Sequence, residues 1–170
     1  MRYFLLSALI AAGTLLAQCG AHAQPKASAN AEQLADAVSR HQFMFDAVTT
    51  TPQRGNSRIL TPGYYFLEIK EDSLICELPY FGRRYSVPAN EELIYGGYQF
   101  STRSFTYKSG AGKRGRVEIE LATRPFNDQL SISLSITKSG WAVVQIQSSG
   151  RESISYYGSV TPLPESKTAP

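Results

Sequence analysis

Cysteine and histidine are scarce in this 170-residue chain, which contains two residues of each. Cys19 and His22 lie in an N-terminal segment that has the features of a cleaved leader, so a processed chain keeps only Cys76 and His41. One thiol cannot form an internal disulfide, and one histidine with one cysteine cannot complete a zinc site. The acidic residues also lack the spacing of a calcium loop. The sequence therefore predicts no metal, no cofactor and a fold stabilised by its core.

Net charge is low as well, because 17 Lys and Arg stand against 14 Asp and Glu, which gives +3 at pH 7. Loss of a leader that contains Arg2 and no acid would lower this value from +3 to +2. Nucleic-acid-binding domains need a strongly basic surface. We therefore expect no nucleic-acid partner.

Motifs for nucleotide binding are missing. The Gly-rich stretch 109–115 has Tyr107 where a phosphate-binding loop needs Gly, and Arg114 where it needs Ser or Thr. A strand pattern follows it instead of a helix. The stretch is expected to be a flexible basic hairpin loop.

Catalytic motifs are missing too. No Gly-x-Ser-x-Gly elbow occurs, and His41 is the only histidine left as a base for a serine nucleophile. Glu118 and Glu120 share the solvent side of a strand by alternation, which favours ordinary surface acids. A hydrolase that uses paired carboxylates with Tyr or Arg in a β cleft stays open, because sequence alone does not show which acids converge.

The one long apolar run, residues 3–17, follows Arg2 and is shorter than the roughly 20 residues of a membrane span. It is followed by Ala21-His22-Ala23, a small-x-small pattern that signal peptidase accepts. The sequence predicts a signal peptide at 1–23, cleaved between Ala23 and Gln24. The product is then exported, with the periplasm as the expected location.

A lipoprotein signal is the competing interpretation, because Leu16-Ala17-Gln18-Cys19 resembles one. Acylation of Cys19 would anchor the chain to the outer membrane. That motif requires a small residue before the cysteine, and Gln18 is not small. We expect membrane contact only if Cys19 is acylated.

Residues 24–40 are expected to be a flexible lead-in and a short helix. Asn30 is a candidate N-cap with Gln33 three positions on, as in a capping box. Leu34 and Val38 share one face at i,i+4, which predicts a helix near 31–40.

From 41 to 161 the apolar pattern has a period of two, which predicts a single β domain. In residues 130–137 one side is wholly aliphatic and the other wholly hydroxyl. The remaining strands are expected at 43–48, 64–70, 74–78, 98–107, 116–122, 141–148 and 153–160. Short turns exclude parallel pairing, so we expect an antiparallel meander of about eight strands, barrel or sandwich. Residues 162–170 are expected to form a loose tail.

Cys76 lies between Leu74 and Leu78 with the same alternation. This position favours a buried thiol that packs as a small hydrophobic side chain over a reactive nucleophile.

The segment 78–88 concentrates aromatic and arginine side chains around a proline and a glycine. One hypothesis is an exposed platform, formed by Tyr80, Phe81, Arg83 and Tyr85, that binds a peptide or glycan. The other is a corner in which Tyr80 and Phe81 close one end of the core.

Leu-Pro-Tyr-Phe-Gly-Arg at 78–83 resembles the hallmark of a bacterial family catalogued as domain of unknown function 4251. Further similar pieces run in order from about residue 40 to 160. They are Phe43 with Phe45, Leu60-Thr61-Pro62, Tyr64-Tyr65, Gly96-Gly97 with Phe100, Ser139-Gly140 with Ala142, and Arg151 followed by Ile154-Ser155-Tyr156 and Gly158. The resemblance implies a secreted protein or lipoprotein of a Gram-negative envelope, in a family without an assigned activity. It implies no catalytic residues.

These observations favour a non-enzymatic envelope module with a ligand-binding, partner-binding or structural role. Its expected partner is an envelope protein, a glycan or a small apolar ligand held as in a lipocalin. Whether the chain is an enzyme is left open, with the carboxylate hydrolase as the alternative.

Overall fold

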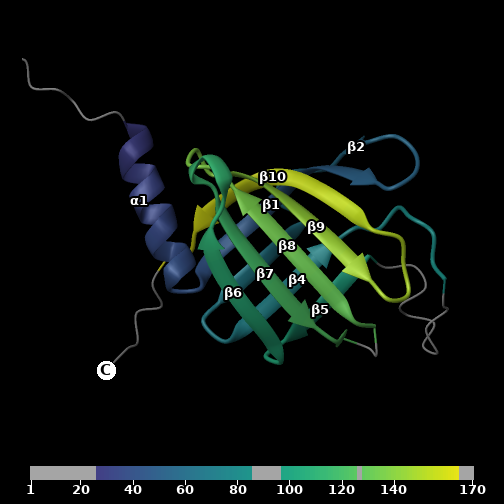
Figure 1. Cartoon of the computed structure of the whole chain (residues 1–170). Helices are drawn as coiled ribbons and strands as arrows, with labels where there is room; N and C mark the ends of the chain where they lie inside the picture. Colours follow the sequence, from purple (N-terminus) through teal and green to yellow (C-terminus); the bar gives the residue numbers. More distant parts are fainter. Residues whose placement is uncertain (1–25, 86–96, 126–127, 165–170) are drawn as a thin grey trace, which may run out of the picture.

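The structure is a computed structural model that describes residues 26–85, 97–125 and 128–164. It consists mostly of β-strands, with one α-helix near the N-terminus (Figure 1). No helix among these residues combines the length and the apolar character needed to cross a membrane. The elements are α1 Lys26–Ser39, β1 Gln42–Pro52, β2 Arg58–Ile59, β3 Phe66–Lys70, β4 Ser73–Leu78, β5 Tyr98–Thr102, β6 Phe105–Ala111, η2 Lys113–Gly115, β7 Val117–Thr123, β8 Leu130–Ile136, β9 Trp141–Ser148 and β10 Ile154–Pro162.

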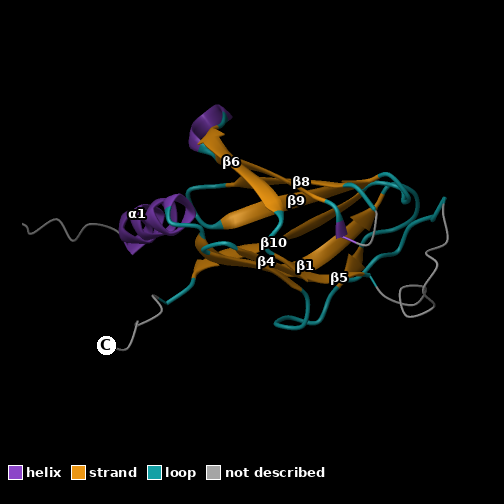
Figure 2. Ribbon diagram, turned by 90° about the horizontal axis from the view of Figure 1, so that it is seen from below, coloured by secondary structure: helices purple, strands orange, loops and turns teal. Residues whose placement is uncertain are grey.

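All pairings are antiparallel and join the strands into one sheet, in the order β5-β4-β3-β1-β10-β9-β8-β7-β6, with β2 beside β1. The sheet curls until it is nearly closed into a barrel, and this decides between the two architectures that the sequence left open. Figure 2 shows β6, β8 and β9 facing β1, β4 and β5 across the interior.

The two edge strands, β5 and β6, follow one another in the chain, and only Arg103 and Ser104 lie between them. The prediction of one strand over 98–107 is therefore wrong. The strands of a curled sheet are tilted, so the pairing register shifts progressively around the barrel. The two edge strands are therefore offset from each other along the barrel axis. At this corner Thr123 Oγ1 donates a hydrogen bond to Ser104 O at 2.9 Å.

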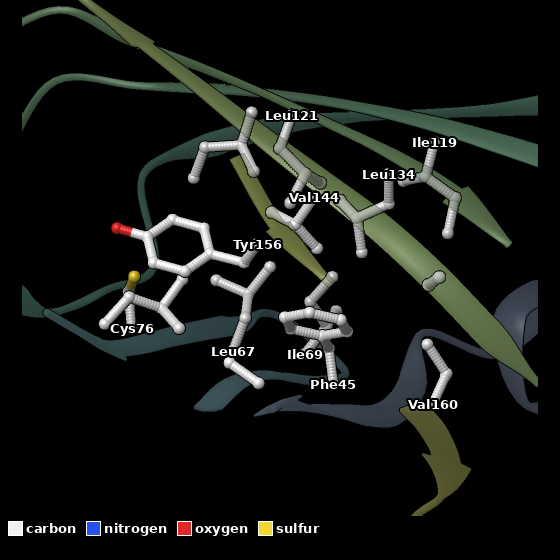
Figure 3. Close-up of a cluster of buried hydrophobic side chains, with 14 of the residues drawn as sticks. Phe45, Leu67, Ile69, Cys76, Ile119, Leu121, Leu134, Val144, Tyr156 and Val160 are labelled. Atoms are coloured by element: carbon white, nitrogen blue, oxygen red, sulfur yellow. The ribbon is translucent and has the colours of Figure 1, made fainter. Parts of the chain in front are cut away.

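Alternation correctly predicted which side chains form the core. Phe43, Phe45 and Ala47 are fully buried, and so are the aliphatic positions of β8. Figure 3 shows side chains from the two walls pointing toward one another, with the Tyr156 ring near Cys76. The Cys76 thiol is fully buried, as predicted, and burial raises its pKa well above the ordinary value.

A β-bulge interrupts the alternation in β1, where the pairing with β10 shifts between Ala47 and Thr49. Gly158 lies opposite the bulge. A Cβ atom at this position would lie 2.9 Å from the Asp46 carbonyl carbon and 3.0 Å from Ala47 Cα. Only glycine allows the two backbones to approach so closely.

The helix α1 packs against one end of the barrel through Leu34, Ala37 and Val38, all of which are buried. Tyr107 of β6 donates its hydroxyl proton to Val38 O at 3.0 Å. The helix begins at Lys26, so the predicted start near 31 is wrong and Asn30 lies within the helix. The segment 26–30 contains two alanines, which favour helix over a lead-in. The predicted signal peptide, its cleavage site and most of the predicted tail lie outside the described residues.

Candidate functional site

The end of the barrel opposite α1 brings together the chain that follows β1, β4, β7 and β9 (Figure 1). Residues 79–85, which we call the strap, cross this end. Tyr85 N donates to Gly150 O at 2.8 Å, and Glu152 N donates to Arg83 O at 3.0 Å. These bonds fasten the strap to the turn between β9 and β10, which the sheet order separates from β4 by β3 and β1.

The Tyr80 side chain stabilises the conformation of the strap through its hydroxyl group. Its hydroxyl oxygen lies 2.6 Å from Arg83 O and 3.1 Å from Glu152 O, and its single proton can be donated to either. Burial raises the pKa of Tyr80, so the hydroxyl keeps its proton to a higher pH than that of an exposed tyrosine. A Cβ atom on Gly82 would lie 2.7 Å from Tyr80 Cζ, so the strap bends around this ring.

Arg151 is the centre of the site, and its side chain is only 10% exposed. The guanidinium carbon lies 4.8 Å from the centre of the Tyr98 ring and 5.4 Å from that of Tyr80. Nη1 donates to Gly97 O at 3.1 Å, and Nε lies 3.8 Å from Asp128 Oδ2. A buried cation needs such compensation, and these contacts join four separate chain segments.

Two carboxylates at this end hold the loops in place. Asp128 accepts bonds at 2.8 Å from the Ser148 hydroxyl, at 2.9 Å from the Ser149 hydroxyl and at 3.2 Å from Gly150 N. The Glu152 side chain is 4% exposed, and its Oε2 accepts a bond from Arg83 N at 3.4 Å. Both acids are engaged with the protein itself, which suits positioning more than proton transfer.

The four residues of the platform hypothesis divide into two pairs. Tyr80 and Phe81 pack against the core, and the Arg58 guanidinium lies 4.5 Å from the centre of the Phe81 ring. Arg83 is exposed, and Tyr85 is 68% exposed. The strap closes one end of the core, and a binding role for Arg83 and Tyr85 stays a prediction.

A second feature, which sequence reasoning missed, lies on the outside of the sheet. Trp141, Val143 and Tyr157 are 42%, 41% and 46% exposed, and Ile59 is 88% exposed. The Trp141 and Tyr157 rings are parallel within 3°, and their centres are 5.1 Å apart. We call these four residues the aromatic face.

The register places the residues of the aromatic face on one side of the sheet. Tyr157 of β10 lies opposite Val143 of β9 and, on its other side, opposite Thr49 of β1. Thr49 in turn lies opposite Ile59 of β2. Residues paired in this way point to the same side of a sheet. The sequence did contain a signal for this side. Trp141 and Val143 alternate with the same period as Gln145 and Gln147, and two glutamines indicate the side of the strand that faces solvent.

Metal binding finds no support in the part of the chain that the structure describes. No group of three or more His, Cys, Asp and Glu side chains there could hold a metal ion. His41 instead packs against Tyr107 where α1 meets the barrel, with 3.8 Å between the ring centres and the two rings tilted by 44°.

The protein is a nearly closed antiparallel β-barrel. The helix α1 covers one end of the barrel, and the strap crosses the other end. The chain belongs to the family described as Domain of unknown function (DUF4251), whose model matches residues 25–160. A crystal structure of a DUF4251 family protein from Bacteroides eggerthii DSM 20697 is similar in fold, with a TM-score of 0.60 and 16% sequence identity. The similarity covers 79% of this chain and 89% of that one. Among proteins with curated descriptions, none matches this chain in sequence.

Proposed function

We propose that this protein is an exported, non-catalytic binding module of the cell envelope, and that it contacts its ligand or partner through the aromatic face. The observation that carries the proposal is the exposure of Trp141, Val143 and Tyr157 next to one another on β9 and β10, with Ile59 on the same side of the sheet beyond Thr49. Isolated exposed apolar residues are ordinary, but a contiguous group of them on one side of a sheet is typical of interaction sites. Tyr and Trp are also the residue types that contribute most to binding.

Export rests on the N-terminal sequence. An apolar segment after Arg2 is followed by the small-x-small pattern before Gln24, as in a cleaved signal peptide. The periplasm is the proposed compartment, and acylation at Cys19 is the alternative that would place the same domain on the outer membrane.

A binding role is preferred to the hydrolase alternative because of how the acids at the barrel end are used. Asp128 and Glu152 each hold backbone or hydroxyl donors of the surrounding loops. A carboxylate that acts on a substrate must instead present a free oxygen in a cleft.

Position-specific photocrosslinking in the source cells tests the proposal. The full chain would carry p-benzoylphenylalanine in place of Tyr157, and in a matched control in place of Tyr64, which is 73% exposed and lies outside the aromatic face. We expect adducts from position 157 that are absent from position 64 and that disappear when Trp141→Ala is added. Equal adducts from both positions would contradict the proposal, and so would the absence of any bound ligand, crosslinked or not, whose binding depends on Trp141 and Tyr157.

A further inference from the structure

The aromatic face is surrounded by uncharged polar side chains. On β8, β9 and β10 every position that shares its side of the sheet lacks a charge, although the chain has 31 charged residues in total, 17 basic and 14 acidic. Besides the aromatic face itself, these outward residues are Ser131, Ser133, Ser135, Gln145, Gln147, Ser155, Ser159 and Thr161. Charge returns on the flanking strands, with Glu118 and Glu120 on β7 and Asp46 on β1. It also reaches the edge of the neutral strands at Ser135, whose hydroxyl accepts a bond from Arg116 Nη1 at 3.3 Å and donates to Glu118 Oε1 at 2.8 Å. The solvent side of an antiparallel sheet normally carries Lys, Arg and Glu, so three neutral strands constitute a specific chemical surface.

A neutral surface of this kind restricts the class of ligand. Nucleic acids and anionic lipid surfaces are recognised by clusters of Lys and Arg, which these three strands lack on their outer side. Protein partners are usually selected by complementary charge as well. A second copy of the same face would bury two sets of serine hydroxyls and glutamine amides, each of which would need a new hydrogen-bond partner.

The side chains that are present match the chemistry of sugars. A sugar ring has apolar C–H groups, which pack on aromatic rings, and hydroxyls that both donate and accept hydrogen bonds. Ser and Thr hydroxyls and Gln amides also offer both functions. Gln145 is already held in place because its Nε2 donates to Ser153 Oγ at 3.2 Å, which leaves its oxygen free to accept a bond.

The shape of the surface favours a chain of sugars over a single one. Ile59, Tyr157 and Val143 lie on β2, β10 and β9, with Thr49 of β1 completing the row. At roughly 4.8 Å between neighbouring strands, this row is about 14 Å long. It follows the outer wall of the barrel, whereas small molecules are usually enclosed in a concave pocket.

We propose that the aromatic face binds an uncharged glycan chain, an inference that rests on the binding role proposed above. Trp141 and Tyr157 supply the stacking surface, and the hydroxyls and amides of β8–β10 supply the hydrogen bonds. The ligand is recognised along its length by several weak contacts, and no charged group takes part.

Affinity gel electrophoresis tests this directly, with the processed chain run through gels that contain dextran, galactomannan or neutral arabinoxylan, and polygalacturonate as the acidic counterpart. We expect at least one neutral polysaccharide to retard the wild-type protein and the Tyr64→Ala control equally. Tyr157→Ala and Trp141→Ala should each weaken the retardation at least about tenfold, which is the loss typical of a central aromatic contact. Retardation should be insensitive to salt, because no charged group contributes.

Fluorescence adds a second readout, because Trp141 is the only tryptophan in the chain. Bound polysaccharide should protect Trp141 from quenching by acrylamide. Retardation by polygalacturonate alone, retardation that survives both aromatic substitutions, or no retardation by any neutral polysaccharide would each overturn the glycan inference.

The crosslinking experiment separates failure of this inference from failure of the proposed function. Protein adducts at position 157 without glycan binding would leave a binding module with a protein partner. A dimer in size-exclusion chromatography that Trp141→Ala converts to a monomer would instead make the aromatic face a contact between two copies. Absence of adducts and of glycan binding together would remove both proposals.

Discussion

The hydroxyl of Tyr156, on the inward side of β10, donates a hydrogen bond of 2.7 Å to the carbonyl oxygen of Pro79, the first residue of the strap. Tyr156 is among the largest fully buried side chains. This bond connects the centre of the barrel to the segment that closes its end, so the strap is part of the folded core.

Replacement of Tyr156 by Phe removes this bond and keeps the ring. We expect the free energy of unfolding to fall by about 1 kcal/mol, since the Pro79 carbonyl loses its buried donor. Urea denaturation followed by circular dichroism measures the change. The neighbouring Tyr157→Phe is the matched control, because its hydroxyl lies on the exposed side, and it should change stability by less than about 0.3 kcal/mol. Equal effects of the two substitutions would contradict the assignment.

Alkaline pH should destabilise the protein. Burial raises the pKa of Cys76, Tyr98 and Tyr156 well above their ordinary values and the pKa of Tyr107 to about 12. In the unfolded chain these groups lose their protons near the ordinary values of 9.0 for Cys and 10.0 for Tyr. Above these values the unfolded state binds fewer protons than the folded state, so the free energy of unfolding decreases as pH rises.

Urea denaturation at intervals from pH 7 to pH 11 tests this expectation. Stability should be nearly constant below pH 8 and then fall, with each such group contributing up to about 1.4 kcal/mol per pH unit. The fall should be shallower in Tyr107→Phe. A profile that stays flat to pH 11 would show that these groups are not protected from ionisation.

Substitution of Gly158 by Ala should disrupt the barrel. The added methyl group would press on the backbone of Asp46 and Ala47 at the bulge. We expect a loss of about 3 kcal/mol or more, or failure to fold. Gly110→Ala is the matched control, since a Cβ there would meet nothing within 4 Å. Thermal denaturation of the two variants distinguishes a steric effect from a general intolerance of alanine in strands.

The double substitution Arg83→Ala with Tyr85→Ala tests whether the strap contacts a ligand. The backbone bonds that fasten the strap are retained, and both side chains are exposed, so stability should change by less than about 0.5 kcal/mol. Polysaccharide retardation should also be unchanged. Loss of binding with intact stability would place the contact surface on the strap, and a large fall in melting temperature would give both residues a structural role.

Periodicity predicted much of the fold because most of the strands bury one side in the core. In β8 the aliphatic residues are buried and the serines face outward, as the alternation required. The strap was recognised as a special segment from its proline, glycine and aromatic residues alone. Its attachment to Gly150 and Glu152 was not predictable, since those bonds depend on which loops share one end of the barrel.

The main error concerns the single strand predicted over residues 98–107. In residues 98–107 the aromatic positions change from even to odd, from Tyr98 and Phe100 to Phe105 and Tyr107, and this break was overlooked. In the structure Thr102 and Phe105 end up on opposite edges of the sheet. The aromatic face was also missed. The sequence placed Trp141 and Val143 in a strand without assigning them to a side of the sheet, and their common side with Tyr157 follows from the pairing of β9 with β10.

Processing at the N-terminus can be tested independently of the fold. Expression of the full chain in a Gram-negative host should yield a periplasmic protein whose intact mass corresponds to a chain that begins at Gln24. Cys19→Ser should leave this mass of the product unchanged. A product that begins at Cys19 and carries acyl groups would establish the lipoprotein alternative.

The sulfur atom at position 76 has no exposed surface. In a chain that begins at Gln24 it is also the only sulfhydryl, so an alkylating reagent can react only when neighbouring strands separate. The rate of alkylation therefore reports how often the folded chain opens, without any attached probe.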